Sequence, residues 1–255
     1  METLIRRSAL AGAALMAVAM TAGAEDLTIV TNVIRNNGAP TSQVTYVSSE
    51  HMRSSNENSE YMVDFATGNL TFIDVKKKEF SVATPQDFEA MAAQLQAQQK
   101  QLDEQMKGMP PAVREKMAGM MGGGAAFATT VTRGTGGRTI AGYACENWTV
   151  TIGESTRQEH CVTTQIPYPL PAYDGMARYM KSMPMLKGMD QMMEKFKQMK
   201  GVSIYHQSTM KIMGKSMTET SEVVEVKKGP IPASTWDVPA GFKKTEWAGA
   251  KLGKR

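Results

Sequence analysis

The sequence predicts an α+β protein in which amphipathic helices cover the concave face of a strongly curved antiparallel sheet of about ten strands. Three observations predict this class. Most of the chain alternates apolar and polar residues with the period of a strand. Two insertions, near 85–121 and 174–200, change to helical spacing. The connections between the expected strands are short, which favours antiparallel neighbours in one sheet.

Period-two alternation with many β-branched and aromatic residues predicts the strands in both halves of the chain. Turn signals at Asn36-Asn37-Gly38, Thr67-Gly68-Asn69 and Thr135-Gly136-Gly137 separate them. After the last strand, Trp236, Val238 and Phe242 are expected to pack as an edge segment. The expected strands are Leu27–Ile34, Ser42–Ser49, Glu60–Phe65, Leu70–Val75, Glu79–Val82, Phe127–Thr132, Thr139–Ile152, Thr156–Gln165, Gly201–Ile212 and Lys215–Lys227.

The first insertion has a recognisable helix start. Thr84 suits the N-cap, Pro85 the first helical position, and Asp87 the positive end of the helix dipole. One apolar stripe then follows at helical spacing, and a similar stripe recurs in the second insertion, which holds eight methionines between Met176 and Met199. The stripe residues of the two insertions include Phe88, Met91, Leu95, Leu186, Met189, Met193 and Phe196.

The first 24 residues have the pattern of a secretory signal peptide. Arg6 and Arg7 precede the apolar run Ser8–Met20, and Ala22-Gly23-Ala24 fits a cleavage site. We therefore expect cleavage after Ala24 and a periplasmic location. No later apolar run is long enough to cross a bilayer, so we expect no transmembrane segment in the mature chain. A single domain would occupy residues 25–243, and residues 244–255 would form a polar basic tail.

The composition narrows the classes of function. The 255 residues contain 22 methionines, 2 cysteines and 3 histidines, and their formal net charge is +4. So few cysteines and histidines exclude a structural zinc cluster and an iron–sulfur site. The charge is too small to indicate a nucleic-acid partner. We find no nucleophile elbow and no metal-ligand spacing among His51, His160 and His206, so we expect neither an enzyme nor a cofactor.

The two cysteines are expected to form a disulfide. Cys145 and Cys161 are equidistant from Gly153, where the chain is expected to turn, so they face each other in the hairpin. Facing residues at a non-hydrogen-bonded position come close enough for a disulfide, and an exported chain meets an oxidising compartment. A reactive Cys–His pair with His160 is the alternative. It is disfavoured because adjacent side chains of a strand point to opposite faces.

Three hypotheses explain the methionine-rich helices. In the first, a non-enzymatic protein binds a lipid, an acyl chain or an apolar polypeptide segment between the concave sheet and the helices, because thioether side chains repack around varied apolar ligands. In the second, thioethers bind Cu(I), with Met183, Met185, Met189, Met192 and Met193 as ligands. In the third, the protein is an envelope scaffold with no small ligand, and the methionines only pack. For the first, the groove candidates are Tyr61, Val63, Phe65, Phe72, Phe88, Met91, Leu95, Met180, Leu186, Met189, Met193, Phe196, Val202 and Ile204.

Several short motifs resemble a family of bacterial exported proteins, domain of unknown function 4412. Residues 137–146, Gly-Arg-Thr-Ile-Ala-Gly-Tyr-Ala-Cys-Glu, contain its Ile-Ala-Gly-Tyr-x-Cys signature. The helix with Met109-Pro110-Pro111-Ala112-Val113-Arg114, the hairpin around Phe72 to Phe80 and the ending from Ile231 to Phe242 are also similar to members of that family. The resemblance implies a fold like that of the periplasmic lipoprotein-localisation carriers, an unclosed β-barrel whose mouth is covered by helices. It implies no catalytic residues. From the groove hypothesis we expect a hydrophobic ligand, or an envelope protein or lipid, as the partner.

Overall fold

All the strands that the structure describes belong to a single sheet. The structure is a computed structural model, and it describes residues 26–108, 129–153, 155–166, 195, 197–212 and 215–249. The sheet has 12 strands in the order β12-β6-β5-β4-β3-β2-β1-β11-β10-β9-β8-β7. The strands are β1 (Leu27–Arg35), β2 (Thr41–Val47), β3 (His51–Ser55), β4 (Ser59–Asp64), β5 (Leu70–Asp74), β6 (Glu79–Ala83), β7 (Thr129–Ile140), β8 (Tyr143–Ile152), β9 (Thr156–Thr163), β10 (Val202–Ile212), β11 (Lys215–Lys228) and β12 (Lys243–Lys244).

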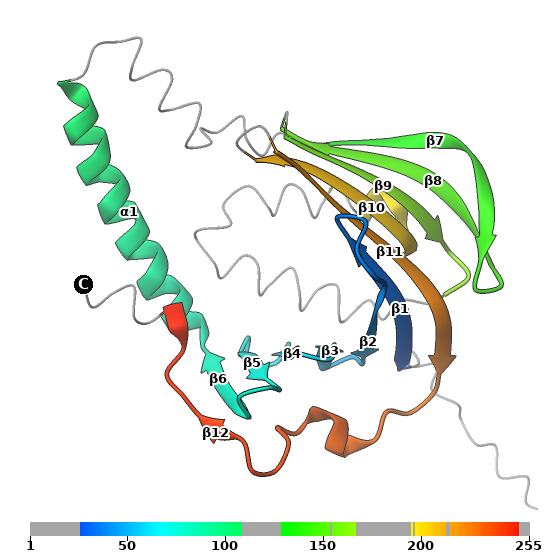
Figure 1. The fold of residues 1–255 in the computed structure, drawn as a ribbon, viewed down its shortest axis with the longest axis horizontal. Helices are drawn as coiled ribbons and strands as arrows, with labels where there is room; N and C mark the ends of the chain where they lie inside the picture. Colours follow the sequence, from blue (N-terminus) through cyan, green and yellow to red (C-terminus); the bar gives the residue numbers. More distant parts are fainter. Residues whose placement is uncertain are drawn as a thin grey trace, which may run out of the picture.

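The sheet is curled and unclosed, as the sequence predicts. Every pairing is antiparallel except that of β12 with β6, which is parallel. Figure 1 shows the strands bending around an open side, with β7 at one end of the strand order and β12 at the other. Twelve strands replace the expected ten or so, because β3 and β12 add to the expected set and the others match it in order.

Strand β3 was missed because its sequence, His-Met-Arg-Ser-Ser, has almost no apolar alternation. Polar partners make its burial tolerable. The Arg53 guanidinium forms an ion pair with Glu60, and the Ser54 hydroxyl accepts a hydrogen bond of 2.7 Å from the Gln43 amide. Buried polar groups of this kind are stable only when they are paired, and the neighbouring strands supply the partners.

The β7–β8 hairpin differs from the expectation in the position of its turn. The sequence predicts a turn at Thr135-Gly136-Gly137, but β7 continues through these residues. The chain turns instead at Ala141-Gly142, where both residues have positive φ, 50° and 83°. The expected long strand Thr139–Ile152 is therefore divided between two strands. The glycines produce a register irregularity between Arg133 and Gly137, which is a common role of glycine in strands.

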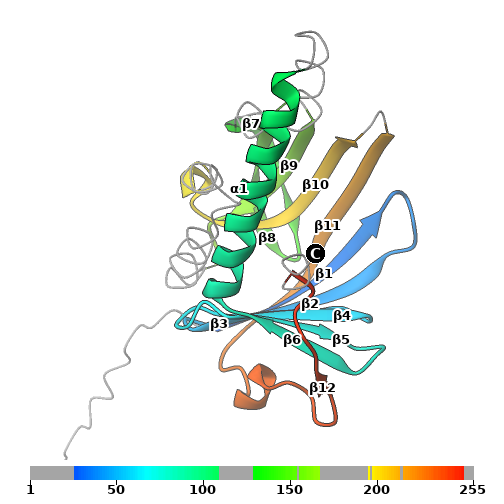
Figure 2. The same ribbon diagram turned by 90° about the vertical axis from the view of Figure 1, so that its left-hand side faces the viewer.

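Helix α1 (Pro85–Lys107) begins as predicted. The Thr84 backbone N–H donates to the Asp87 carboxylate at 2.8 Å, and the Asp87 N–H donates to the Thr84 hydroxyl at 3.2 Å, a reciprocal cap. Only Phe88 and Ala92, in its first turns, are buried among the described side chains of the helix. Beyond Gln94 the described side chains of α1 are exposed. Figures 1 and 2 show α1 rising from the end of β6 and standing beside the open side of the sheet.

Helix α1 therefore does not show the expected covering of the concave face by amphipathic helices. The rest of the first insertion, from residue 109, and nearly all of the second lie outside the described residues. Those parts of the expectation stay predictions.

The hydrophobic core lies on the face of the sheet that carries Val63 and Leu70, against the first turns of α1. Its members come from both halves of the sheet, and Trp247 packs edge-to-face on Phe88 with ring centroids 5.1 Å apart. Trp247 lies in the segment that the sequence analysis treats as a polar tail. The buried members are Leu27, Ile29, Val47, Val63, Phe65, Ala83, Phe88, Ile140, Cys145, Cys161, Ile166, Val202, Ile204 and Val223.

The C-terminal segment crosses the opposite face of β3. The Arg53 guanidinium donates to the backbone carbonyls of Thr235 and Asp237, the latter at 2.9 Å, and the His51 ring stacks on Trp236 at 5.1 Å. These contacts belong to the 3₁₀ turn η4 (Ala233–Trp236) and the residue after it. Of the expected edge segment Trp236–Phe242, Trp236 thus stacks on β3, whereas the edge strand β12 begins directly after Phe242.

Candidate functional site

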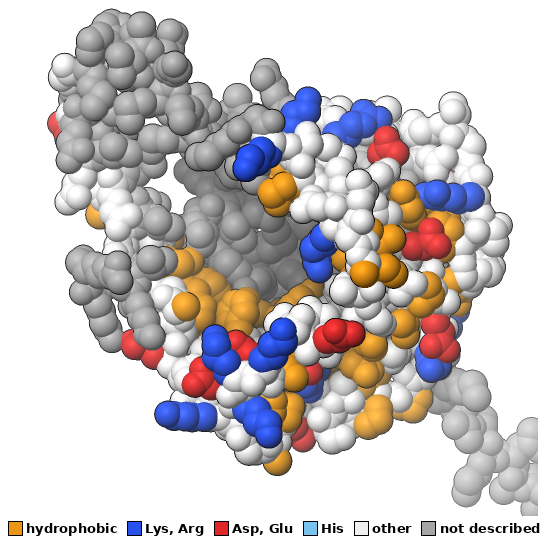
Figure 3. Space-filling view, viewed as in Figure 1, with side chains coloured by type: hydrophobic (Ala, Val, Ile, Leu, Met, Phe, Trp, Pro, Cys, Tyr) orange, Lys and Arg blue, Asp and Glu red, His pale blue; other side chains and the backbone are white. Residues whose placement is uncertain are grey.

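The candidate site is a groove at the centre of the sheet. A cavity of about 250 Å³ lies over β1, β2, β10 and β11. Strand alternation brings side chains from these four strands to one face, since Ile29 pairs with Thr45 and Thr31 with Val223. Figure 3 shows the surface hollowed between α1 and the strands, with hydrophobic side chains along the lower edge of the hollow. The lining residues are Ile29, Thr31, Thr45, Val47, Val202, Ser203, Ile204, Ser221 and Val223.

The groove wall mixes aliphatic and hydroxyl side chains. Val47, Ile204 and Val223 are almost fully buried and provide the apolar part. Thr31, Thr45, Ser203 and Ser221 contribute hydroxyls. A cavity with an apolar base and a few hydroxyls suits an apolar molecule that carries a polar group.

Two register irregularities border the groove. One lies in the β1–β11 pairing between Val30 and Thr31, and the other in the β10–β9 pairing between Ser203 and Tyr205. An extra residue in one strand increases the local twist and bends the sheet. These bulges therefore help to curl the sheet at the groove.

The predicted groove residues divide into three groups. Val202 and Ile204 line the cavity. Val63, Phe65 and Phe88 are buried in the core, with Met91 half-buried beside them. Tyr61 and Phe72, a cross-strand pair of β4 and β5 on the same face as Val63, are each 39% exposed. None of these last six reaches the described lining of the cavity.

The remaining predicted residues lie outside the part of the chain that the structure describes. Met180, Leu186, Met189, Met193 and Phe196 lie outside the described residues, as does the Leu95 side chain. The five proposed copper ligands (Met183, Met185, Met189, Met192 and Met193) also lie outside them.

Sequence reasoning missed most of the lining. Ile29, Thr31, Thr45 and Val47 alternate along two predicted strands, so their common face was readable. What the sequence does not contain is the pairing of β1 with β11, which brings the first strand of the chain beside residues almost 200 positions later.

Two imidazoles stack beside the groove. His160 of β9 and His206 of β10 are cross-strand partners with ring centroids 4.7 Å apart. His160 Nδ1 lies 3.0 Å from the hydroxyl of Ser203, a lining residue, and that hydroxyl donates to the Tyr205 carbonyl at 2.8 Å. The other ring nitrogen of His160, Nε2, lies 3.3 Å from Gln158 Oε1.

Burial keeps this histidine pair neutral. Burial, and to a lesser degree repulsion by His206, lowers the pKa of His160 to about 4. Burial also lowers the pKa of His206, whose buried Nε2 has no hydrogen-bond partner among the described residues. Two neutral rings stack without charge repulsion, whereas protonation would place like charges side by side.

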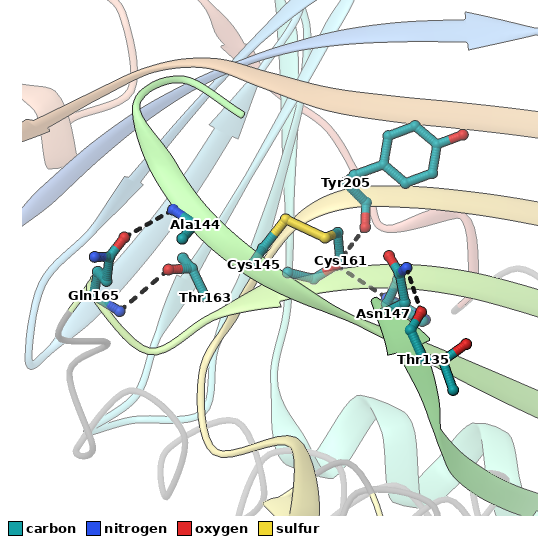
Figure 4. Close-up of a disulfide and its surroundings, with 10 residues drawn as sticks. Thr135, Ala144, Cys145, Asn147, Cys161, Thr163, Gln165 and Tyr205 are labelled. Carbon is teal, nitrogen blue, oxygen red and sulfur yellow. Dashed lines mark hydrogen bonds between the residues drawn. A yellow bond between two sulfur atoms is a disulfide. The ribbon is translucent and has the colours of Figure 1, made fainter. Parts of the chain in front are cut away.

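The expected disulfide is present. Cys145 and Cys161 are joined, with Cα atoms 5.3 Å apart. Figure 4 shows the bond bridging the two strands near Asn147, whose side-chain amide donates to the Thr135 carbonyl at 3.1 Å. Both cysteines belong to the buried core. The bond fixes the β8–β9 pair, and no free cysteine remains for the alternative Cys–His chemistry.

A second depression, of about 350 Å³, lies over β7, β8, β9 and β10. Its most distinctive contact is the Arg138 guanidinium, 3.8 Å from the centre of the Tyr205 ring. This is a cation–π contact. Asn147, Trp148 and Glu159 are also among the lining residues.

Within the described residues, no three His, Cys, Asp or Glu side chains are grouped as metal ligands. No described helix is both long and apolar enough to cross a membrane.

Comparisons with known proteins give distant likenesses of the backbone. PNGF-II is 10% identical with a TM-score of 0.42, and the match covers 91% of this chain but only 32% of that one. An uncharacterized conserved protein from Thermus thermophilus is 6% identical with a TM-score of 0.46, over 88% of this chain and 91% of the other.

MucB is a third structural neighbour. It is 10% identical with a TM-score of 0.38, and the match covers 86% of this chain and 58% of MucB. A complex of MucB with MucA from Pseudomonas aeruginosa gives a similar match, 11% identical with a TM-score of 0.38, over 85% of this chain and 56% of that chain. No curated protein matches the sequence. The family model for domain of unknown function DUF4412 matches residues 112–242, just over half of the chain, and the protein therefore belongs to the DUF4412 family.

Proposed function

We propose that this protein is a non-enzymatic binding protein of the periplasm that holds an acyl chain or a similar apolar group in the central groove. The cavity over β1, β2, β10 and β11 carries this proposal. Its volume of about 250 Å³ lies just below the ~300–1,000 Å³ usual for small-molecule sites. It would therefore take a short or branched apolar group, or one end of a longer one.

The lining supports an amphiphilic ligand. Val47, Ile204 and Val223 would remove apolar surface of the ligand from water, at roughly 25 cal/mol per Å² before the costs of binding. Thr31 and Ser221 hydroxyls would meet its polar end. The methionine-rich insertions are expected to close the groove, because thioether side chains adapt to varied apolar shapes.

Displacement of a fluorescent probe tests the proposal. Anilinonaphthalene sulfonate (ANS) should bind the purified protein, and a medium-chain fatty acid should displace it. Ser221→Phe should fill the cavity and abolish displaceable binding. Ser216→Phe is the control. Ser216 lies on β11 near the hairpin end and is exposed in the wild type, so this variant should bind ANS as the wild type does.

Two results would refute the proposal that the groove binds an apolar ligand. One is the absence of displaceable ANS binding to the folded wild type. The other is normal binding by a folded Ser221→Phe variant. Native mass spectrometry of the protein purified from its own cells gives an independent readout, because a copurified lipid is the expected result.

A further inference from the structure

A second surface, at the edge of the sheet, brings together lysines from distant parts of the sequence. Lys76, Lys77 and Lys78 form the turn between β5 and β6, and Lys243 and Lys244 form β12. The two groups meet because β12 pairs with β6, and the Lys243 N–H donates to the Lys78 carbonyl at 2.9 Å. We call these five residues the lysine patch.

The patch has more positive charge than its neighbours neutralise. Among the five lysines, Asp74 forms an ion pair only with Lys77, with an Nζ to Oδ2 distance of 3.0 Å. Glu79, opposite Lys243 in the register, and the exposed Glu246, two residues after Lys244, add two further carboxylates. The four other ammonium groups have no ion pair with any described residue, and all five side chains are exposed. Figure 3 shows blue side chains gathered over β5, β6 and β12, below the hollow.

The chemistry of the patch fits a plane of phosphates. Lysine presents a mobile point charge, whereas arginine presents a planar fork that suits bidentate recognition of one carboxylate or phosphate. The patch contains five lysines and no arginine. A lipid surface with anionic headgroups offers many phosphates that move laterally, so it needs no fixed geometry in its partner.

Aromatic side chains nearby favour a lipid surface over an acidic protein. Phe72 lies in β5, four residues before the first lysine of the turn, and it pairs with Tyr61 of β4. Each is 39% exposed, which is high for residues of this size. Exposed aromatic side chains are common at the membrane interface, and this pair lies on the Val63 face of the strands that lead toward the lysine turn.

We propose that the lysine patch docks this protein on a lipid surface rich in anionic headgroups. This contact is separate from ligand binding in the groove. It would orient the molecule with the edge of β5, β6 and β12 toward the membrane.

Vesicle cosedimentation tests the proposal. The protein should bind phosphatidylglycerol vesicles and not phosphatidylcholine vesicles, and about 0.5 M salt should release it because screening weakens such contacts. Each lysine near an anionic surface contributes about a fivefold factor in partitioning. The variant K76Q/K78Q/K243Q/K244Q should therefore lose roughly 600-fold in partition coefficient.

Two matched variants separate the patch from overall charge. K211Q/K215Q/K227Q/K228Q removes the same charge from exposed positions on β10 and β11 and should bind nearly as well as wild type. K76R/K78R/K243R/K244R keeps the charge of the patch and should also bind. ANS displacement tests the groove without vesicles, and cosedimentation tests the lysine patch. A negative result in one assay therefore leaves the other proposal standing.

The proposal is overturned if the wild type ignores phosphatidylglycerol vesicles, or binds both kinds of vesicle equally. It is also overturned if K211Q/K215Q/K227Q/K228Q loses as much binding to phosphatidylglycerol vesicles as K76Q/K78Q/K243Q/K244Q does. Tight binding to polyglutamate, an acidic polypeptide, without binding to vesicles would assign the patch to a protein partner instead.

Discussion

Cys145 and Cys161 form a disulfide although they are not cross-strand partners. The register pairs Cys161 with Asn147, so the bond runs diagonally between β8 and β9. The expectation that they face each other directly is wrong, because the hairpin is centred one residue after Gly153 and this moves the pairing by two positions. A shift of two keeps both side chains on the same face, so the bond still forms.

Removal of this disulfide should destabilise the protein. It closes a loop whose ends are 16 residues apart, and the loss of that constraint on the unfolded chain costs about 3 kcal/mol. Urea unfolding of C145S/C161S should show this decrease. Reduction of the wild type with dithiothreitol should give the same midpoint as the double variant. An unchanged midpoint in both would mean that the β8–β9 register needs no covalent support.

The histidine pair predicts a loss of stability in acid. Because burial lowers the pKa of His160 to about 4 and lowers that of His206, the unfolded chain binds more protons below about pH 6.5. Stability from the neutral pair is complete above that pH and decreases as the pH falls toward 4. The His160 shift alone corresponds to about 3 kcal/mol.

Urea midpoints measured from about pH 7.5 to about pH 4, the range that spans the folded and unfolded pKa values, test this. H160Q/H206Q should flatten the pH dependence, whereas H51Q should leave it as in the wild type, since His51 stacks on Trp236 away from the pair. A wild type equally stable at both ends of that range would contradict the argument.

The buried Arg53–Glu60 pair predicts strong and asymmetric effects of mutation. Both side chains are largely buried, at 10% and 14% exposed. Arg53→Met leaves the Glu60 carboxylate without its partner and releases the carbonyls of Thr235 and Asp237, and it should cost about 3–5 kcal/mol. Limited proteolysis should then cut the C-terminal segment faster. R53M/E60L should recover much of the stability because no buried charge remains.

The copper hypothesis makes a prediction opposite to that of the groove. Replacement of Met183, Met185, Met189, Met192 and Met193 with Leu removes soft sulfur ligands and keeps apolar bulk. We expect ANS displacement to persist in this variant. Competition with a Cu(I) chelator measures the alternative. Tight Cu(I) binding by the wild type that disappears in the variant would favour copper handling.

The sequence predicted most elements because the signals are local. Period-two alternation located nine of the twelve strands closely, and Thr84 with Asp87 located the start of α1. Prediction from the sequence failed where a strand is stabilised by a partner on another strand. The polar strand β3 is buried because Glu60 and Gln43 pair with it. The two-residue strand β12 exists because β6 offers an unpaired edge.

The amino-acid sequence alone determined the curled antiparallel sheet, the helix cap, the disulfide and the family signature, since each depends on neighbours in the chain or on spacing within one hairpin. The tertiary structure decided the groove and the lysine patch. Ile29 meets Val223, and Lys78 meets Lys243, only through pairing of strands about 165 to 200 residues apart. No local pattern encodes such a pairing, because strand order depends on which edges remain open when the sheet is assembled.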